Sequence, residues 1–221
     1  MKKISLLLIC LLCVLTTLTG CSNENNTLSP KSYMPDSDQI TGVCIDVRDR
    51  EIEVVASADG YIHIDYYENE KEYYTISVSE DHVLTMTAET DKDWTDYIGG
   101  KAASGSRKIT LQIPDETLLT LQLSTTNEDI ALSAFVIKGD VRLSNNGGNI
   151  GFDKLNVGNS ITLSNKNADI SGSIVGSYDD YAIKTTVKKG NSSLPTDKQS
   201  GDKTLDVSNN NGDININFIS E

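Results

Sequence analysis

The second half of the chain repeats an apolar–polar pattern at an interval close to twenty residues. Leu121–Ser124 recurs as Val141–Ser144, Ile161–Ser164 and Leu205–Ser208, and in a weaker form as Ile183–Thr186. A unit this short cannot bury its apolar side chains alone, so successive copies must stack to make a core. The repeat therefore predicts a short β-solenoid, similar to a single-stranded β-helix, of about five levels over residues 119–221.

Stacking predicts files of like side chains along the solenoid, and we expect the copies to stack in sequence order. Each copy has two inward positions in its first strand and one apolar position after a polar turn. The expected inward files are Leu121/Val141/Ile161/Ile183/Leu205, Leu123/Leu143/Leu163/Val207 and Ile130/Ile150/Ile170/Ile214.

Acidic and amide residues precede the apolar position after each turn. Read in sequence order they are Asp129, Asn149, Asp169, Asn191 and Asp213. Alternation of this kind would keep carboxylates two levels apart and so reduce their repulsion. The aspartates 129, 169 and 213 are weak candidates for cation binding, but the turns match neither the RTX nonapeptide nor the EF-hand loop. Asn, Asp and Gly are also the residues that tight turns require, which is the favoured interpretation.

Residues 40–118 alternate with a period of two and form the other predicted region. The expected strands are Glu51–Ser57, Ile62–Tyr66, Tyr74–Val78, Val83–Thr87 and Lys108–Ile113. Short strands in series predict an antiparallel meander, or half of a sandwich, that leads into the solenoid. Asp59-Gly60 lies between two of these runs and predicts a tight hairpin. The fold class is therefore all-β.

The N-terminus has the layout of an export signal. Lys2 and Lys3 precede a short apolar run, which is typical of a secretory signal and too short to span a bilayer. Leu18-Thr19-Gly20-Cys21 resembles the lipobox of bacterial prolipoproteins. That resemblance implies cleavage between Gly20 and Cys21 and lipid on the Cys21 thiol. We therefore expect residues 1–20 to be a cleaved signal and 21–39 a lipidated cysteine with a flexible tether. The protein would then be anchored on the extracytoplasmic face of the cell membrane.

The remaining composition argues against several other classes of protein. The net charge of −13 lacks the basic surface that nucleic-acid binding requires. Once residues 1–20 are removed and Cys21 carries lipid, Cys44 cannot form an intramolecular disulfide, and we expect it to be a small buried hydrophobe. The two histidines, His63 and His82, lack a metal-ligand spacing. No cofactor is expected.

The loop over residues 90–106 interrupts the strand pattern and has two prominent aromatic residues. Trp94 and Tyr97 are candidates for partner binding, because aromatic side chains often anchor interfaces. The favoured alternative is that this loop folds its own aromatics over an edge of the sheet.

The repeated motif resembles a known bacterial family. The motif S-x-x-x-G/E-D/N-I occurs over Ser124–Ile130, Ser144–Ile150, Ser164–Ile170 and Ser208–Ile214, after a strand that ends at Pro114. Together these resemble a β-strand-repeat family of unknown function whose members are often named putative adhesins. The resemblance implies an envelope protein without established catalytic residues. The fourth copy departs from the motif, with Ser192 in place of the apolar residue and an insertion over 193–203 that is expected to loop out.

Three functions follow as hypotheses. The first is a non-catalytic, membrane-anchored protein that binds an envelope or surface protein or a polysaccharide. The second is an envelope-stress or signalling accessory that binds a membrane partner. The third, and least favoured, is a polysaccharide lyase or hydrolase on a β-helix that uses Asp129 and Asp169 as acid and base. The sequence has none of the common motifs of nucleophilic or metal catalysis.

Overall fold

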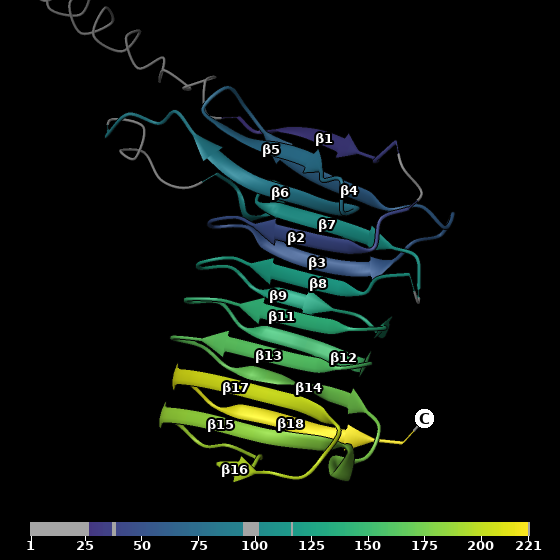
Figure 1. The fold of residues 1–221 in the computed structure, drawn as a ribbon. Coiled ribbons are helices and arrows are strands. Elements are labelled where there is room, and N and C mark those ends of the chain that lie inside the picture. The colour runs from purple at the N-terminus through teal and green to yellow at the C-terminus, as the bar shows by residue number, and fades with distance from the viewer. Residues whose placement is uncertain (1–26, 37–38, 95–101, 116, 221) are drawn as a thin grey trace, which may run out of the picture.

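Two mixed β-sheets lie face to face and enclose one core in the computed structural model of the chain (Figure 1). The structure describes residues 27–36, 39–94, 102–115 and 117–220. Sheet 1 contains, from edge to edge, β1 (Ser29–Tyr33), β4 (His63–Glu68), β7 (Lys108–Ile113), β3 (Glu51–Ala56), β9 (Ile130–Leu132), β12 (Ile150–Val157), β14 (Ile170–Val175) and β18 (Ile214–Ile219), with β10 (Phe135–Ile137) beside β12. Sheet 2 contains β16 (Asp197–Lys198), β15 (Tyr181–Lys189), β17 (Lys203–Asn211), β13 (Ser160–Asn165), β11 (Asp140–Ser144), β8 (Thr120–Ser124), β2 (Gly42–Asp46), β6 (Val83–Thr90) and β5 (Glu72–Val78). Two short 3₁₀ turns, η3 (Ser104–Ser106) and η4 (Tyr178–Asp180), complete the described elements.

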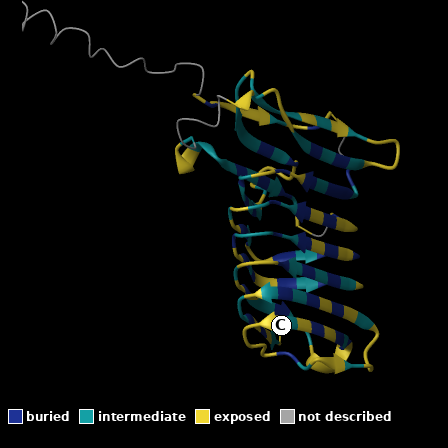
Figure 2. Cartoon of the chain, turned by 90° about the vertical axis from the view of Figure 1, so that its left-hand side faces the viewer, coloured by how far each residue is buried: buried dark blue, intermediate teal, exposed yellow. Residues whose placement is uncertain are grey.

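The predicted stacking of the first three repeats is confirmed. β8, β11 and β13 pair in parallel and in register, so that Leu123, Leu143 and Leu163 occupy one file. The members of the three predicted inward files are all buried. Figure 2 shows the resulting alternation of buried and less buried residues along the strands of the repeats. We call a strand of sheet 2, together with the strand of sheet 1 that follows it in the chain, a level of the stack.

The predicted order of the last two repeats is wrong. β17 lies between β13 and β15, so Leu205 stacks directly on Ile161, and Ile183 lies outermost. The physical reason is the weakness of the fourth copy. Its Ser192, in place of an apolar residue, makes only an isolated bridge to Ile214 in sheet 1. The level at the end of the stack packs against a neighbour on one side only, so the weakest copy is accommodated there. The insertion was expected to loop out, but it contains β16, which pairs with β15 and covers its free edge.

The N-terminal strands also differ from the predicted antiparallel meander. β2 pairs in parallel with both β6 and β8, and β3 pairs in parallel with both β7 and β9. These strands therefore continue the stack, because Val43 and Leu84 extend the file of Leu121. One buried cluster includes residues on both sides of the predicted boundary at 118/119. In the described part of the chain, antiparallel pairing is confined to β1–β4, β4–β7, β5–β6 and β15–β16.

Three smaller expectations are corrected. Asp59-Gly60 does not close a hairpin, because β7 lies between β3 and β4. The expected tether contains β1, which pairs with β4 from Ser29 to Tyr33. Cys44 is half-buried, because the strand directs its neighbours Val43 and Ile45 into the core and the cysteine outward. Residues 1–26, including the predicted signal and Cys21, lie outside the described residues.

A file of buried polar residues, which the repeat did not predict, lies directly after the repeated serines. Asn145, Asn165 and Asn209 are each at most 2% exposed. The Asn165 side-chain amide donates to the carbonyls of Gly148, at 2.9 Å, and Ala168, at 3.1 Å. Buried backbone carbonyls at the turns are thereby satisfied from inside the stack, which fixes the turn of each level.

Candidate functional site

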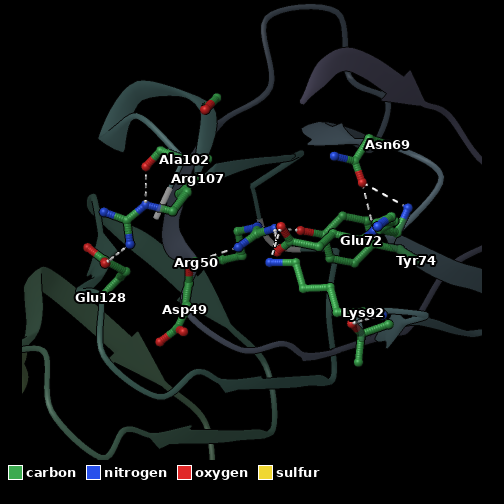
Figure 3. A network of polar contacts seen from close by, with 12 residues as sticks. Asp49, Arg50, Asn69, Glu72, Tyr74, Lys92, Ala102, Arg107 and Glu128 are labelled. Atoms are coloured by element: carbon green, nitrogen blue, oxygen red, sulfur yellow. Dashed lines mark hydrogen bonds and ion pairs between the residues drawn. The ribbon is translucent and has the colours of Figure 1, made fainter. Parts of the chain in front are cut away.

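A groove of about 450 Å³ lies at the N-terminal end of sheet 2. Its walls come from the β2–β3 connection and from β5 and β6, and its lining includes Arg48, Arg50, Glu72, Tyr74 and Lys92. The β2–β3 connection places charged residues here because it leaves the core at the end of an apolar strand. Figure 3 shows Arg50, Glu72, Tyr74 and Lys92 converging from separate segments.

Arg50 forms the floor of the groove and is only 4% exposed. Its Nη2 lies 2.9 Å from Glu72 Oε2, and its Nε donates to the Tyr74 hydroxyl at 2.7 Å. The second carboxylate oxygen of Glu72 lies 2.5 Å from Lys92 Nζ. Charge-assisted hydrogen bonds of this kind are stronger than neutral ones. The network therefore holds the start of β5 and the segment after β6 against the β2–β3 connection.

The electrostatics of the network keep the Glu72 carboxylate ionised and the Tyr74 hydroxyl neutral at neutral pH. Burial alone would raise the pKa of Glu72, but hydrogen bonds from Lys92 and Arg50 outweigh it and lower the pKa. Burial raises the pKa of the Tyr74 hydroxyl. A carboxylate with both oxygens engaged and a lowered pKa is a poor proton donor or acceptor near pH 7. The arrangement is suited to holding a shape and a charge pattern, which is what binding requires.

A second network joins the same connection to the following level. Arg107 pairs with Glu128, and its Nε donates to the Ala102 carbonyl at 3.0 Å. The Asp49 backbone N–H donates to the Thr126 hydroxyl at 3.0 Å. Neither network was predicted from the sequence. The signal that was available is the cluster of charges from Arg48 to Glu51 directly after an apolar strand.

The weak cation candidates have a structural role instead. The five Asp and Asn residues before the apolar position form a file along the stack, and the first four each accept a backbone N–H from the next residue of the file through side-chain Oδ1. The N–H of Asn149 donates to Asp129, that of Asp169 to Asn149, that of Asp213 to Asp169, and that of Asn191 to Asp213. The predicted alternation is broken, because Asp169 and Asp213 are neighbours. Among the described residues, no group of three or more His, Cys, Asp or Glu side chains is placed to hold a metal ion.

The other sequence candidates do not gather into a site. Trp94 is 76% exposed, so it does not cover a sheet edge, while Tyr97, Gly20 and Cys21 lie outside the described residues. His63 Nε2 lies 2.9 Å from Asp59 Oδ2. The pKa of Asp59 is lowered to about 2, first by the Tyr61 backbone N–H and then by His63 and Ser57. Burial, followed by the nearby Asp46 carboxylate, raises the pKa of the Cys44 thiol, which disfavours a reactive thiolate.

The stacked sheets define an all-β repeat protein with a polar groove at the N-terminal end of sheet 2. The chain belongs to the DUF4097 family, described as Toastrack, whose model matches residues 40–175. None of the curated proteins matches the sequence.

Solved structures are similar to the chain to different degrees, all at low sequence identity. A putative cell adhesion protein from Clostridium sporogenes ATCC 15579 is 8% identical with a TM-score of 0.61, over 87% of this chain and 100% of that one. A putative adhesin from Bacteroides fragilis NCTC 9343 is 15% identical with a TM-score of 0.34, over 87% and 97% of the two chains. A putative lipid binding protein from Parabacteroides distasonis ATCC 8503 is 14% identical with a TM-score of 0.30, over 86% and 97%. The first of these supports the fold.

Within the described residues, no helix has the length and apolar character needed to cross a membrane.

Proposed function

We propose that this protein is a lipid-anchored, non-catalytic binding protein on the extracytoplasmic face of the cell membrane. Its folded part is a short β-solenoid that binds a polar surface ligand, either an envelope or surface protein or a polysaccharide. The lipobox-like Leu18–Cys21 supports the anchor, with acyl chains such as palmitate on Cys21. The family and the adhesin-like neighbours support the binding role.

The observation that carries the proposal is the internally paired floor of the groove. Arg50, Glu72 and Lys92 satisfy one another, so the floor is rigid before any ligand arrives. Arg48 lines the same groove and is exposed, which leaves its guanidinium available at the mouth. A preorganised surface loses little conformational entropy on binding. Arg48 can donate paired hydrogen bonds to a carboxylate or another oxygen-rich group.

The test compares two matched charge reversals in cells that display the protein. Arg48→Glu changes the groove, while Arg142→Glu makes the same change at an exposed position of β11 away from it. Attachment of the cells to purified envelope polysaccharide and to neighbouring cells is measured. We expect Arg48→Glu to weaken attachment about tenfold, or roughly 1.4 kcal/mol, and Arg142→Glu to leave it unchanged. Cys21→Ala should release the protein into the medium.

Two results would contradict this function. One is equal attachment by the two variants and by a strain that lacks the protein. The other is turnover of a polysaccharide that is abolished by Asp169→Ala, which would indicate the enzymatic alternative.

A signalling accessory role is favoured by one observation, the position of the groove. The groove lies at the end of the stack where β1 begins, and β1 lies within the predicted tether, eight residues after Cys21. A partner in the same membrane could therefore reach it. Photo-crosslinking from Tyr73 at the groove, with Lys184 at the far end as the control, distinguishes the two roles. An accessory should give one stoichiometric adduct with a membrane protein, from Tyr73 alone.

A further inference from the structure

Trp94 is the only tryptophan of the chain, and its side chain is 76% exposed. It follows β6 at the N-terminal end of the stack. Lys92, two residues earlier, is fixed by its ion pair with Glu72, so the backbone that leads to the tryptophan is held by the groove network. The large ring of Trp94, with a polar N–H at one edge, offers an amphipathic surface that an interface between water and an apolar phase can accommodate.

The start of β1 lies at the same corner of the molecule. Ser29 pairs with Glu68 at the end of β4, and the Asn69 N–H donates to the Glu72 carbonyl at 2.8 Å across the β4–β5 turn. Glu72 in turn pairs with Thr90 at the end of β6. These contacts connect the beginning of β1 to the segment that contains Trp94, and Figure 1 shows the two at the same upper corner.

The length of chain before β1 limits how far this corner can lie from a membrane anchor. Leu28 is 6% exposed and so is held within the fold. The seven steps from position 21 to position 28 span at most about 25 Å when fully extended. If Cys21 carries lipid, Leu28 and the start of β1 stay within this distance of the headgroups, whereas the far end of the stack can lie farther away.

We propose that Trp94 inserts into the lipid headgroup layer and sets the protein upright on the membrane, with β1 and β5 toward the bilayer and β15 and β16 away from it. This inference rests on the proposed lipid anchor. β5 and β15 are seven strand spacings apart in sheet 2, which is roughly 34 Å. The groove would then lie at the membrane-proximal end of the stack, within reach of envelope components and of a partner in the same membrane, and the C-terminal levels would face outward.

The chemistry around Trp94 defines the kind of lipid surface it fits. Tryptophan favours the membrane interface, where its ring is in the apolar boundary and its N–H reaches polar groups. Asp91 and Asp93 flank it, and these carboxylates are repelled by anionic lipids. The partner is therefore a zwitterionic headgroup layer, and the ring remains at headgroup depth.

The single tryptophan makes the test direct. The full-length lipidated protein is reconstituted into phosphatidylcholine vesicles, with and without brominated acyl chains, and its tryptophan emission is recorded. Flotation of the protein with the vesicles reports the lipid anchor separately. The control, Trp94→Phe with Tyr178→Trp, moves the only tryptophan to the exposed position in η4, at the opposite end of the stack.

We expect the wild-type emission to shift to shorter wavelength and to be quenched by the brominated lipid, while the control floats without a shift or quenching. Replacement of most of the phosphatidylcholine by phosphatidylglycerol should reduce the wild-type shift. Flotation without quenching of Trp94 overturns the proposal and leaves the anchor intact. Equal quenching of both reporters overturns the upright orientation. Failure of the wild type to float overturns the anchor and this inference together.

Discussion

The Asp213 backbone N–H donates to Asp169 Oδ1 at 2.8 Å, although the two residues are 44 positions apart in the chain. Elsewhere in the file the same bond joins residues 20 or 22 positions apart. The longer separation arises because the last two repeats do not stack in sequence order: β17 lies between β13 and β15. The acceptor oxygen, which Asp and Asn share, is what the stack requires of this position.

Asp169→Asn should leave stability nearly unchanged, because the amide oxygen still accepts the Asp213 N–H. Asp169→Ala removes the acceptor and should lower the free energy of unfolding by about 1 kcal/mol. Urea unfolding followed by circular dichroism measures both variants. A loss in Asp169→Asn as large as that in Asp169→Ala would mean that the charge, and not the hydrogen bond, is what the position needs.

The exchanged strand order can be tested with engineered disulfides. Ser164 and Ser208 are paired in register, and their Oγ atoms lie 3.3 Å apart. In a Cys44→Ser background, Ser164→Cys with Ser208→Cys should crosslink under mild oxidation. Ser164→Cys with Thr186→Cys should not, because β17 separates those strands. Crosslinking is measured by the change in gel mobility on reduction. A crosslink in the 164/186 pair but not in the 164/208 pair would indicate that the repeats stack in sequence order.

The buried asparagine file should be sensitive to substitution. Asn165→Ala removes the side-chain donor for the Gly148 carbonyl inside the stack, and leaves the Ala168 carbonyl with only the Asn209 amide as a side-chain donor. We expect a loss of roughly 2–3 kcal/mol in the free energy of unfolding. Lys166→Ala, the exposed neighbour, serves as the control and should change it by less than about 0.5 kcal/mol. Equal losses of stability in Asn165→Ala and Lys166→Ala would contradict the structural role of the buried asparagines.

The ion pair of the groove predicts a specific dependence on pH. The pKa of Glu72 is lowered in the folded protein, so folding favours its ionised form. The stabilisation is present above the ordinary value of 4.5 and is lost as the pH falls below it through the folded-state pKa.

Glu72→Gln should therefore destabilise the protein by roughly 2 kcal/mol at pH 7, and the difference from wild type should shrink as the pH falls below 4.5. Denaturant unfolding at several pH values measures the difference. Glu70→Gln changes an exposed neighbouring carboxylate and is the control. A difference that stays constant down to pH 2 would contradict the pairing.

The local pattern of the sequence determined which residues form strands and which of their side chains enter the core. Alternation identified β3, β4, β5, β6 and β7 because a strand places successive side chains on opposite faces. The twenty-residue interval identified the three inward files because in-register pairing aligns equivalent positions. Both are properties of neighbouring residues, so they can be read along the chain.

Tertiary structure alone decided the order and direction of the strands. Val43, Leu84 and Leu121 are equally apolar, and nothing within β2 specifies that it lies between β6 and β8. The choice depends on which level closes the core at each end, and that is a property of the whole stack. The groove was missed for the same reason, because Arg50, Glu72 and Lys92 meet only when distant strands have paired.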